Sequence, residues 1–299
     1  MWEQLKKEME KGDVKSLARC ISLVENEAAG FENFLESLVI PDVPVIGITG
    51  PPGAGKSTLT DALIGILVNQ KKKVGVLCID PSSPFNMGAL LGDRIRMHNW
   101  YNNPDVFIRS LSTKASLGGL NPKTIEITDL LKISTFDYII IETVGVGQSE
   151  IEIAALADVT VVVLVPESGD EIQSMKSGLM EIADIFVVNK SDRPNADQFV
   201  RNLKQMISPA FSRHSVEMPV IKTVASEKKG TEELMDAISQ FLEVDRGNEK
   251  RSLLLAEKAY QLIQNKRMQD VSKLDLAKEL SEVKNKENIF RFIKKYTQG

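Results

Sequence analysis

The stretch VIGITGPPGAGKST, residues 45–58, predicts the fold more directly than any other part of the sequence. It begins as an apolar strand, matches the pattern G-x-x-x-x-G-K-[ST] at every fixed position, and leads into residues 59–67, which are apolar at helical spacing. Glycines at such a turn let successive backbone N–H groups converge on a phosphate, and the helix N-terminus adds its dipole. We therefore predict a phosphate-binding loop in which Lys56 contacts β- and γ-phosphate oxygens and the Ser57 hydroxyl binds Mg²⁺. The residues of this loop predicted to bind the nucleotide are Gly50, Gly53, Ala54, Gly55, Lys56, Ser57 and Thr58.

Short β-branched runs alternate with helical segments over the middle of the chain. The expected strands are residues 45–49, 74–79, 106–109, 138–142, 159–165, 185–188 and 220–223. Most are apolar throughout, which is typical of a parallel sheet covered on both faces. The alternation predicts βαβ units and a three-layer α/β domain with a mostly parallel sheet.

Both ends of the chain have helical patterns instead. Near the start, Leu17, Ile21 and Val24 share one helix face, and Asp13 is placed to cap a helix over residues 14–27. Residues 246–299 are helical in pattern but too short to bury their own apolar stripe. We therefore divide the chain into an N-terminal helical extension (1–43), a nucleotide-binding domain (44–245) and a C-terminal helical arm (246–299).

Composition narrows the class of protein. Of 299 residues, 42% are hydrophobic and 26% charged, and the net charge of −4 does not favour binding to nucleic acid or to an anionic membrane. The charge is uneven, because residues 246–299 carry a net +6 and the rest −10. Two cysteines exclude a disulfide framework. The start lacks a signal-peptide pattern and no apolar run approaches membrane-span length, so we expect a cytoplasmic protein.

The sixth expected strand ends in a base-recognition motif. Residues 185–192 read IFVVNKSD, an apolar strand followed by N-K-x-D, and the predicted base-binding residues are Asn189, Lys190 and Asp192. An Asp carboxylate accepts hydrogen bonds from the N1–H and exocyclic amine of guanine, and adenine offers no matching pair of donors. Ala225, after the next strand, would present its backbone N–H to guanine O6. The sequence thus predicts a guanine nucleotide.

The fourth expected strand delivers an acid to the phosphate side of the sheet. In YIIIETVG, residues 138–145, Glu142 is placed to hold Mg²⁺ through water and the Gly145 N–H to contact the γ-phosphate. Ras-like proteins have Gln directly after this Gly, whereas Val146 stands here. The candidate acids for orienting the attacking water are Asp80, at the end of the second strand, and Asp93.

Taken together, these motifs resemble the MeaB/ArgK-type G proteins, the family that includes the methylmalonic aciduria type A protein. The resemblance covers nearly the whole chain, and its most specific stretch is ETVGVGQSE at residues 142–150. Residues 80–83 (DPSS), 90–94 (LLGDR) and 169–173 (GDEIQ) also match. The chain departs from the usual pattern at residues 84–87 and 114–115, and at Glu167, where Gly is usual.

The resemblance implies properties that the residues alone do not. The fold would be a SIMIBI-type P-loop G domain with a C-terminal helical dimerisation arm, and the protein a homodimer. Asp80, Asp93 and Glu142, with Ser57, would serve magnesium binding, and Lys56 and the three acids would serve hydrolysis. The function would be a GTPase chaperone that gates cobalamin loading of an adenosylcobalamin-dependent acyl-CoA mutase, such as methylmalonyl-CoA mutase, and protects it. The sequence lacks D-x-H-x-x-G, so cobalamin is expected to be the partner's cofactor.

Three alternatives remain open at this point. A nickel-insertion GTPase for hydrogenase or urease would need clustered His or Cys ligands, and the two histidines, His98 and His214, are far apart in sequence. A kinase acting on a transport protein would need an acceptor-binding domain. A non-catalytic scaffold that uses bound GTP structurally is compatible with the missing Ras-type Gln. Isobutyryl-, hydroxyisobutyryl-, ethylmalonyl- and methylmalonyl-CoA mutases are all candidate partners.

Overall fold

The computed structural model describes most of the first 244 residues and part of the remainder. The described residues are 1–80, 97–112, 123–143, 153–154, 156–168, 179–211, 218–244, 252, 256, 259–260, 262–264, 266–268, 270–282 and 288–297. The chain forms two compact units, Met1–Arg251 and Ser252–Gly299. Within the described residues, no helix is long and apolar enough to cross a membrane.

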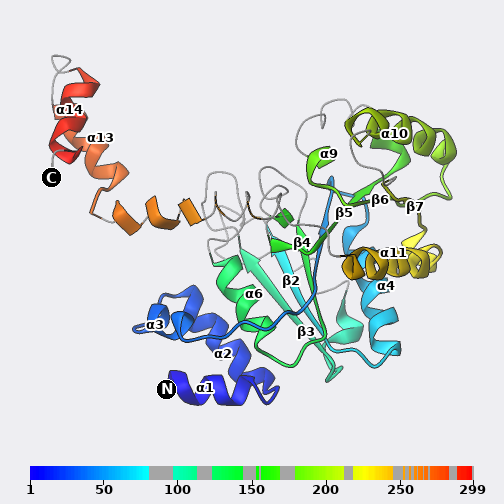
Figure 1. Cartoon of the computed structure of the whole chain (residues 1–299), viewed down its shortest axis with the longest axis horizontal. Coiled ribbons are helices and arrows are strands. Elements are labelled where there is room, and N and C mark those ends of the chain that lie inside the picture. Colours follow the sequence, from blue (N-terminus) through cyan, green and yellow to red (C-terminus); the bar gives the residue numbers. More distant parts are fainter. Residues whose placement is uncertain are drawn as a thin grey trace. The chain divides into compact units, whose positions relative to one another are not determined.

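A seven-stranded, fully parallel sheet forms the centre of the first unit (Figure 1). Its spatial order is β3-β2-β4-β1-β5-β6-β7. The strands are β1 (Val45–Thr49), β2 (Val74–Asp80), β3 (Val106–Ser112), β4 (Tyr138–Thr143), β5 (Val159–Leu164), β6 (Ile185–Val188) and β7 (Val220–Lys222). All seven expected strands are confirmed, and the parallel sheet with helices on its faces confirms the P-loop class.

Helices cover both faces of this sheet. The described residues of the first unit contain the helices α1 (Trp2–Met9), α2 (Val14–Glu25), α3 (Phe31–Glu36), α4 (Lys56–Asn69), α6 (Thr124–Lys132), α9 (Leu179–Ile182), α10 (Ala196–Phe211) and α11 (Thr231–Glu243). They also contain the 3-10 turns η1 (His98–Trp100), η2 (Pro166–Ser168) and η3 (Ala225–Glu227). Neighbouring strand residues face opposite layers: Val76 belongs to the apolar cluster that includes residues of α4 and α11, whereas Leu77 belongs to the cluster that includes residues of α2 and α6. This alternation explains why the strands are apolar throughout.

The amino ends of three strands share one repeated contact. Asp158, directly before β5, donates its N–H to the Val45 carbonyl (2.7 Å) while its Oδ2 accepts the Val45 N–H (2.8 Å). Asp184 makes the same pair of bonds with Thr160 (2.9 and 2.8 Å). Asp137 does so with Lys73 (2.8 Å for both bonds). Each carboxylate thus satisfies a backbone N–H near the start of a strand, in β1, in β5 or directly before β2.

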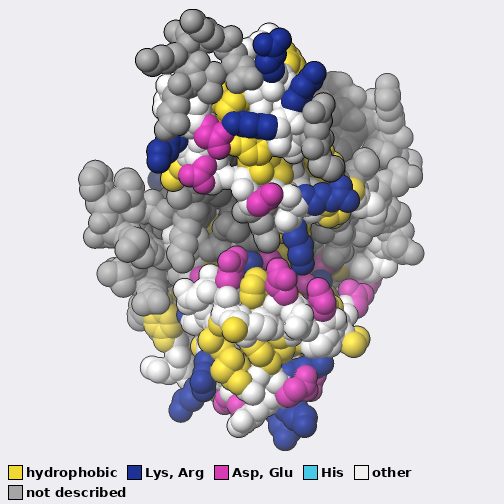
Figure 2. All heavy atoms as spheres, turned by 90° about the vertical axis from the view of Figure 1, so that its left-hand side faces the viewer, with side chains coloured by type: hydrophobic (Ala, Val, Ile, Leu, Met, Phe, Trp, Pro, Cys, Tyr) yellow, Lys and Arg dark blue, Asp and Glu magenta, His cyan; other side chains and the backbone are white. Residues whose placement is uncertain are grey.

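The N-terminal helices pack against the sheet through an apolar face that includes Leu17 and Ile21, both buried. The predicted cap is confirmed, because the Ser16 N–H donates to Asp13 Oδ2 (2.8 Å) at the start of α2. Val39 and Ile40, after α3, are 85% and 39% exposed. Figure 2 shows apolar side chains among charged ones on the side of the molecule where the N-terminal helices lie.

The second unit contains α13 (Lys273–Glu282) and α14 (Ile289–Thr297). These helices contact each other through Glu279, which accepts hydrogen bonds from Lys295 and from the Tyr296 hydroxyl. Phe292 is buried, while Phe290 is 72% exposed. The described residues of this unit thus include two helices, while the expected arm over residues 246–299 stays a prediction.

Candidate functional site

The phosphate-binding loop connects β1 to α4 at the carboxyl end of the sheet. Gly50 and Gly55 have φ values of +136° and +88°, a region that L-residues with a Cβ rarely adopt. Their surroundings also exclude a side chain. A Cβ at Gly50 would lie 2.1 Å from the Val163 carbonyl oxygen, and one at Gly55 would lie 2.4 Å from Asn189 Nδ2. The sequence pattern therefore reflects close packing of the loop as well as its backbone conformation.

Lys56, the first residue of α4, is buried at the centre of this loop. Its ammonium donates to the carbonyl oxygens of Gly50 (2.8 Å) and Pro51 (2.9 Å). Both acceptors belong to the loop itself, so the lysine head lies where the loop backbone would surround a phosphate. A bound nucleotide would offer this ammonium phosphate oxygens in place of neutral carbonyls, which are the weaker acceptors.

Ser57 and Glu142 meet beside the loop. The Ser57 hydroxyl donates to Glu142 Oε1 (2.6 Å), and the Thr60 hydroxyl, one turn further along α4, donates to Oε2 (2.9 Å). Glu142 is 4% exposed on β4, which neighbours β1. A hydroxyl and a carboxylate oxygen at this separation are the hard oxygen ligands that Mg²⁺ prefers, so the donor set fits a magnesium ion.

The other predicted acids fall partly outside the described residues. Asp80 is the last residue of β2, in register with Ser112 of β3, and its side chain is not described. Its strand also pairs with β4, where Cys78 is opposite Glu142. The sheet therefore places Asp80 at the same carboxyl edge as Glu142. Asp93 and Gly145 lie outside the described residues.

Asn189 connects the phosphate loop to the segment after β7. Its Nδ2 donates to the Ala54 carbonyl (2.8 Å), while its Oδ1 accepts from the Thr223 hydroxyl (3.0 Å) and from the Ala225 N–H (3.1 Å). The side chain is 2% exposed. Three segments of the predicted nucleotide site thus meet at one amide. The Ala225 N–H, predicted to meet guanine O6, donates to Asn189 in this structure.

The rest of the N-K-x-D motif forms a tight turn. Lys190 has a φ of +55°, and its ammonium donates to the Gly53 carbonyl (2.7 Å). The Ser191 N–H donates to the Thr223 carbonyl (3.0 Å) and the Arg193 N–H to the Lys190 carbonyl (3.0 Å). Asp192 is exposed at this turn, where its carboxylate is accessible to a base.

Two polar contacts near the site were not anticipated from the sequence. Thr60 lies one turn after Lys56 in α4, a spacing that marks it as a neighbour of the loop once the helix is known. The Thr143 hydroxyl donates to Thr49 Oγ1 (2.8 Å), and both residues are buried. No local signal identifies this second contact, because the two residues are 94 positions apart.

Clustered metal ligands are not found in the described part of the chain, where no group of three or more His, Cys, Asp and Glu side chains could hold an ion. The His98 side chain and the whole of His214 lie outside the described structure. Glu8 and Asp13, at the other end of the sheet, have lowered pKa values because Ser16 hydrogen-bonds to both carboxylates.

Comparison with known proteins identifies the family. The family model described as "Methylmalonyl Co-A mutase-associated GTPase MeaB" matches residues 17–279. A Pyrococcus abyssi protein, named as a candidate GTPase, is 46% identical over 248 residues, which are 81% of this chain and 76% of that protein. The GTPase ArgK of Escherichia coli is 34% identical over 78% of this chain and 73% of its own length.

Two further similarities concern a fusion protein and a solved structure. A protein of Geobacillus kaustophilus named fused isobutyryl-CoA mutase is 37% identical over 81% of this chain, a match that spans 24% of that larger protein. The crystal structure of an LAO/AO transport system kinase superposes with a TM-score of 0.67 and 26% identity, over 90% of this chain and 84% of that one. With the loop, the acid and the base-recognition turn in place, these matches establish that the chain belongs to the MeaB family of P-loop GTPases and binds GTP and GDP.

Proposed function

We propose that this GTPase acts as a nucleotide-dependent chaperone of an adenosylcobalamin-dependent acyl-CoA mutase, gating cofactor loading and protecting the mutase. The observation that carries the proposal is the Geobacillus kaustophilus fusion, in which a section 37% identical to this chain belongs to the same polypeptide as isobutyryl-CoA mutase. Fusion keeps two activities together at a fixed stoichiometry, and separate chains with the same function must bind each other instead.

The hydrolysis of GTP to GDP and phosphate depends mainly on positioning and charge neutralisation. Lys56, buried within the loop, supplies a positive charge for the β- and γ-phosphate oxygens. Ser57 and Glu142 would hold Mg²⁺, Glu142 through water, and the ion would neutralise charge on those oxygens. Thr60 positions Glu142 through its hydrogen bond to Oε2, so the carboxylate stays directed at Ser57.

Asp80 is the candidate for orienting the attacking water. No Gln follows Gly145, since Val146 occupies that position, and another acceptor must take its role. Asp80 ends the strand next to β4 and therefore shares the edge of the sheet with Glu142. Asp93 is the second candidate acid, with Asp80 and Glu142, for magnesium binding and hydrolysis, and the Gly145 N–H would contact the γ-phosphate.

Guanine would be recognised by the turn after β6. Asp192 would accept the N1–H and the exocyclic amine, and the Ala225 N–H would donate to O6 by exchanging Asn189 Oδ1 for the base. Residues 246–299 would form the arm of a homodimer. Their net charge of +6 distinguishes this arm from the acidic remainder of the chain.

The coupling can be tested with purified mutases and single-turnover GTP hydrolysis. The rate is measured alone and with each of isobutyryl-, hydroxyisobutyryl-, ethylmalonyl- and methylmalonyl-CoA mutase, in apo and cobalamin-loaded forms. We expect one mutase to accelerate hydrolysis and to bind in the presence of a non-hydrolysable GTP analogue. Unchanged rates and no binding with all four would refute the chaperone proposal, while the GTPase assignment would stand.

Asp80→Ala tests the proposed water-orienting residue separately. We expect GTP binding close to wild type with a large loss of single-turnover rate, both alone and with the mutase. Unchanged hydrolysis would remove Asp80 from the catalytic role. Lys56→Ala serves as the matched loss-of-function variant, because its ammonium is expected to contact the phosphates whichever acid orients the water.

A further inference from the structure

Arg193, directly after the N-K-x-D motif, contacts a different loop of the site. Its guanidinium Nη1 donates to Glu167 Oε1 at 2.5 Å. Glu167 lies in η2, immediately after β5, and Arg193 lies in the turn after β6. Because β5 and β6 are neighbours, with Leu164 opposite Val188, their two following segments leave the sheet next to each other. The ion pair therefore joins adjacent loops at the carboxyl edge.

Asp192 depends on the backbone of that turn for its position. Among the described residues, no hydrogen bond holds the Asp192 carboxylate, which is exposed. The turn is held by backbone bonds and by two side chains. Lys190 reaches Gly53 in the phosphate loop (2.7 Å), and Arg193 reaches Glu167. Asp192 lies between these two anchored residues, so loss of either anchor frees the turn on one side.

The electrostatic surroundings of Glu167 agree with this arrangement. The pKa of Glu167 is lowered, first by the hydrogen bond from Arg193 and further by the positive charges of Arg193 and Lys190. The basic residues of the turn therefore favour the charged form of this carboxylate.

We propose that Arg193 is a positioning residue for guanine recognition and that its ion pair with Glu167 holds Asp192 at the base. The proposal rests on the assignment of Asp192 as the guanine-reading residue. It concerns the contrast between guanine and hypoxanthine, because only guanine carries the exocyclic amine that Asp192 is expected to bind. A merely structural contact would change the affinity for both bases equally.

The test measures dissociation constants for GDP and IDP with wild type, Glu167→Gln, Arg193→Gln and the double variant. Exposed ion pairs contribute modestly, so we expect each single variant to lower the preference for GDP over IDP by about two- to fivefold. The double variant should be no worse than either single one, because all three lose the same contact. Thermal unfolding of each variant checks that the fold is intact.

A second exposed ion pair provides the matched control. Lys222 and Asp197 join β7 to α10 with an N–O distance of 2.9 Å and comparable exposure. Lys222→Gln and Asp197→Asn should leave the GDP-to-IDP ratio unchanged. The proposal is overturned by a wild-type ratio in Arg193→Gln, by additive losses in the double variant, or by an equal loss in the controls.

A separate variant tests whether Asp192 is the guanine-reading residue. Asp192→Asn replaces an acceptor with an amide that can donate to the O2 of xanthine, so the preference should move from GDP towards XDP. If it does not move, the assignment of Asp192 is wrong. If it moves while Arg193→Gln keeps the wild-type ratio, the role of Arg193 alone is refuted.

Discussion

Asn189→Ala removes the amide at which three segments of the nucleotide site meet. The substitution deletes the bond to the Ala54 carbonyl and the bonds from the Thr223 hydroxyl and the Ala225 N–H. A net contribution of about 1 kcal/mol per hydrogen bond is increased where a buried partner is left unsatisfied. The Thr223 hydroxyl can rotate to another acceptor, whereas the two backbone groups cannot. We therefore expect a loss of about 3 to 4 kcal/mol in the free energy of unfolding.

Urea unfolding followed by tryptophan fluorescence measures this loss. The chain has two tryptophans, Trp2 and Trp100, and both lie in the first unit, so the signal reports the unit that contains the site. At roughly 2 to 4 °C per kcal/mol for a unit of this size, the melting temperature should fall by about 10 °C. GDP binding should weaken as well, because the phosphate loop loses one of its two connections to the base-recognition turn and keeps only the Lys190–Gly53 hydrogen bond.

Asn202→Ala provides the control on α10, where the side chain is exposed and accepts a hydrogen bond from Gln198 (2.8 Å). We expect this variant to remain within about 0.5 kcal/mol of wild type. If Asn189→Ala loses less than about 1 kcal/mol, or no more than Asn202→Ala, the three bonds do not carry the stability assigned to them and the reasoning fails.

Three further substitutions test other parts of the structure. Glu142→Gln keeps hydrogen-bonding capacity but removes the charge, so Mg²⁺-dependent hydrolysis should fall roughly 10- to 100-fold, and a wild-type magnesium titration would contradict the assignment. Gly50→Ala places a Cβ 2.1 Å from the Val163 carbonyl oxygen at a φ of +136°; we expect more than about 3 kcal/mol of destabilisation or no soluble protein, and wild-type urea unfolding would refute this. Burial raises the pKa of Asp129 from 3.8 to about 6, so wild-type stability declines as pH rises between these values. Asp129→Asn should therefore be more stable at pH 7, by about 1 to 2 kcal/mol after solvent screening, with the difference closing below about pH 4; equal stability at pH 7 would count against a raised pKa.

The strands were predictable because their signal is local. A parallel sheet covered on both faces needs continuous apolar runs, and each of the seven runs formed a strand. The ends were less predictable. β3 continues to Ser112, beyond the expected end at Arg109, because residues 110–112 pair with β2 although only Leu111 among them is apolar. The helix expected over residues 14–27 ends at Glu25, and Glu27 has a left-handed φ of +50°.

Site residues were likewise predictable where a short sequence motif contains them, and not where a contact joins residues far apart in the sequence. Lys56, Ser57 and Asn189 belong to motifs with fixed spacing, and the structure brings their segments together. The motifs of Asp93 and Gly145 are equally clear in the sequence, but those residues lie outside the described structure and remain predictions. Contacts such as Thr60–Glu142, 82 positions apart, and Arg193–Glu167, 26 positions apart, depend on strand order. No periodicity encodes that order, so these pairs became visible only in three dimensions.

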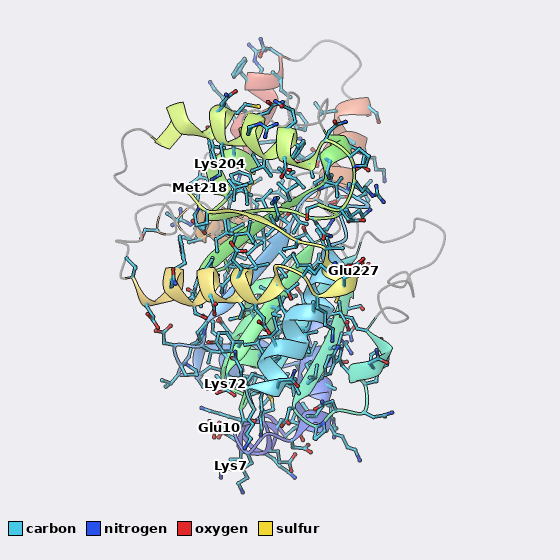
Figure 3. All side chains as sticks on the ribbon, turned by 90° about the vertical axis from the view of Figure 1, so that its right-hand side faces the viewer. Lys7, Glu10, Lys72, Lys204, Met218 and Glu227 are labelled. Atoms are coloured by element: carbon cyan, nitrogen blue, oxygen red, sulfur yellow. The ribbon has the colours of Figure 1, made fainter. Side chains whose placement is uncertain are left out.

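The two ends of the strands use polar side chains in different ways. At the amino ends, Asp137, Asp158 and Asp184 each bond to both backbone groups of one residue in, or directly before, a neighbouring strand. Figure 3 shows that Lys72 and Glu227 are well separated. Lys72 follows the end of α4, and Glu227 lies in η3, beside the base-recognition segment. At the carboxyl ends, Glu142 and Asn189 bond to hydroxyls and loop groups instead of ladder groups. A ligand that displaced those partners would therefore leave the strand pairing intact.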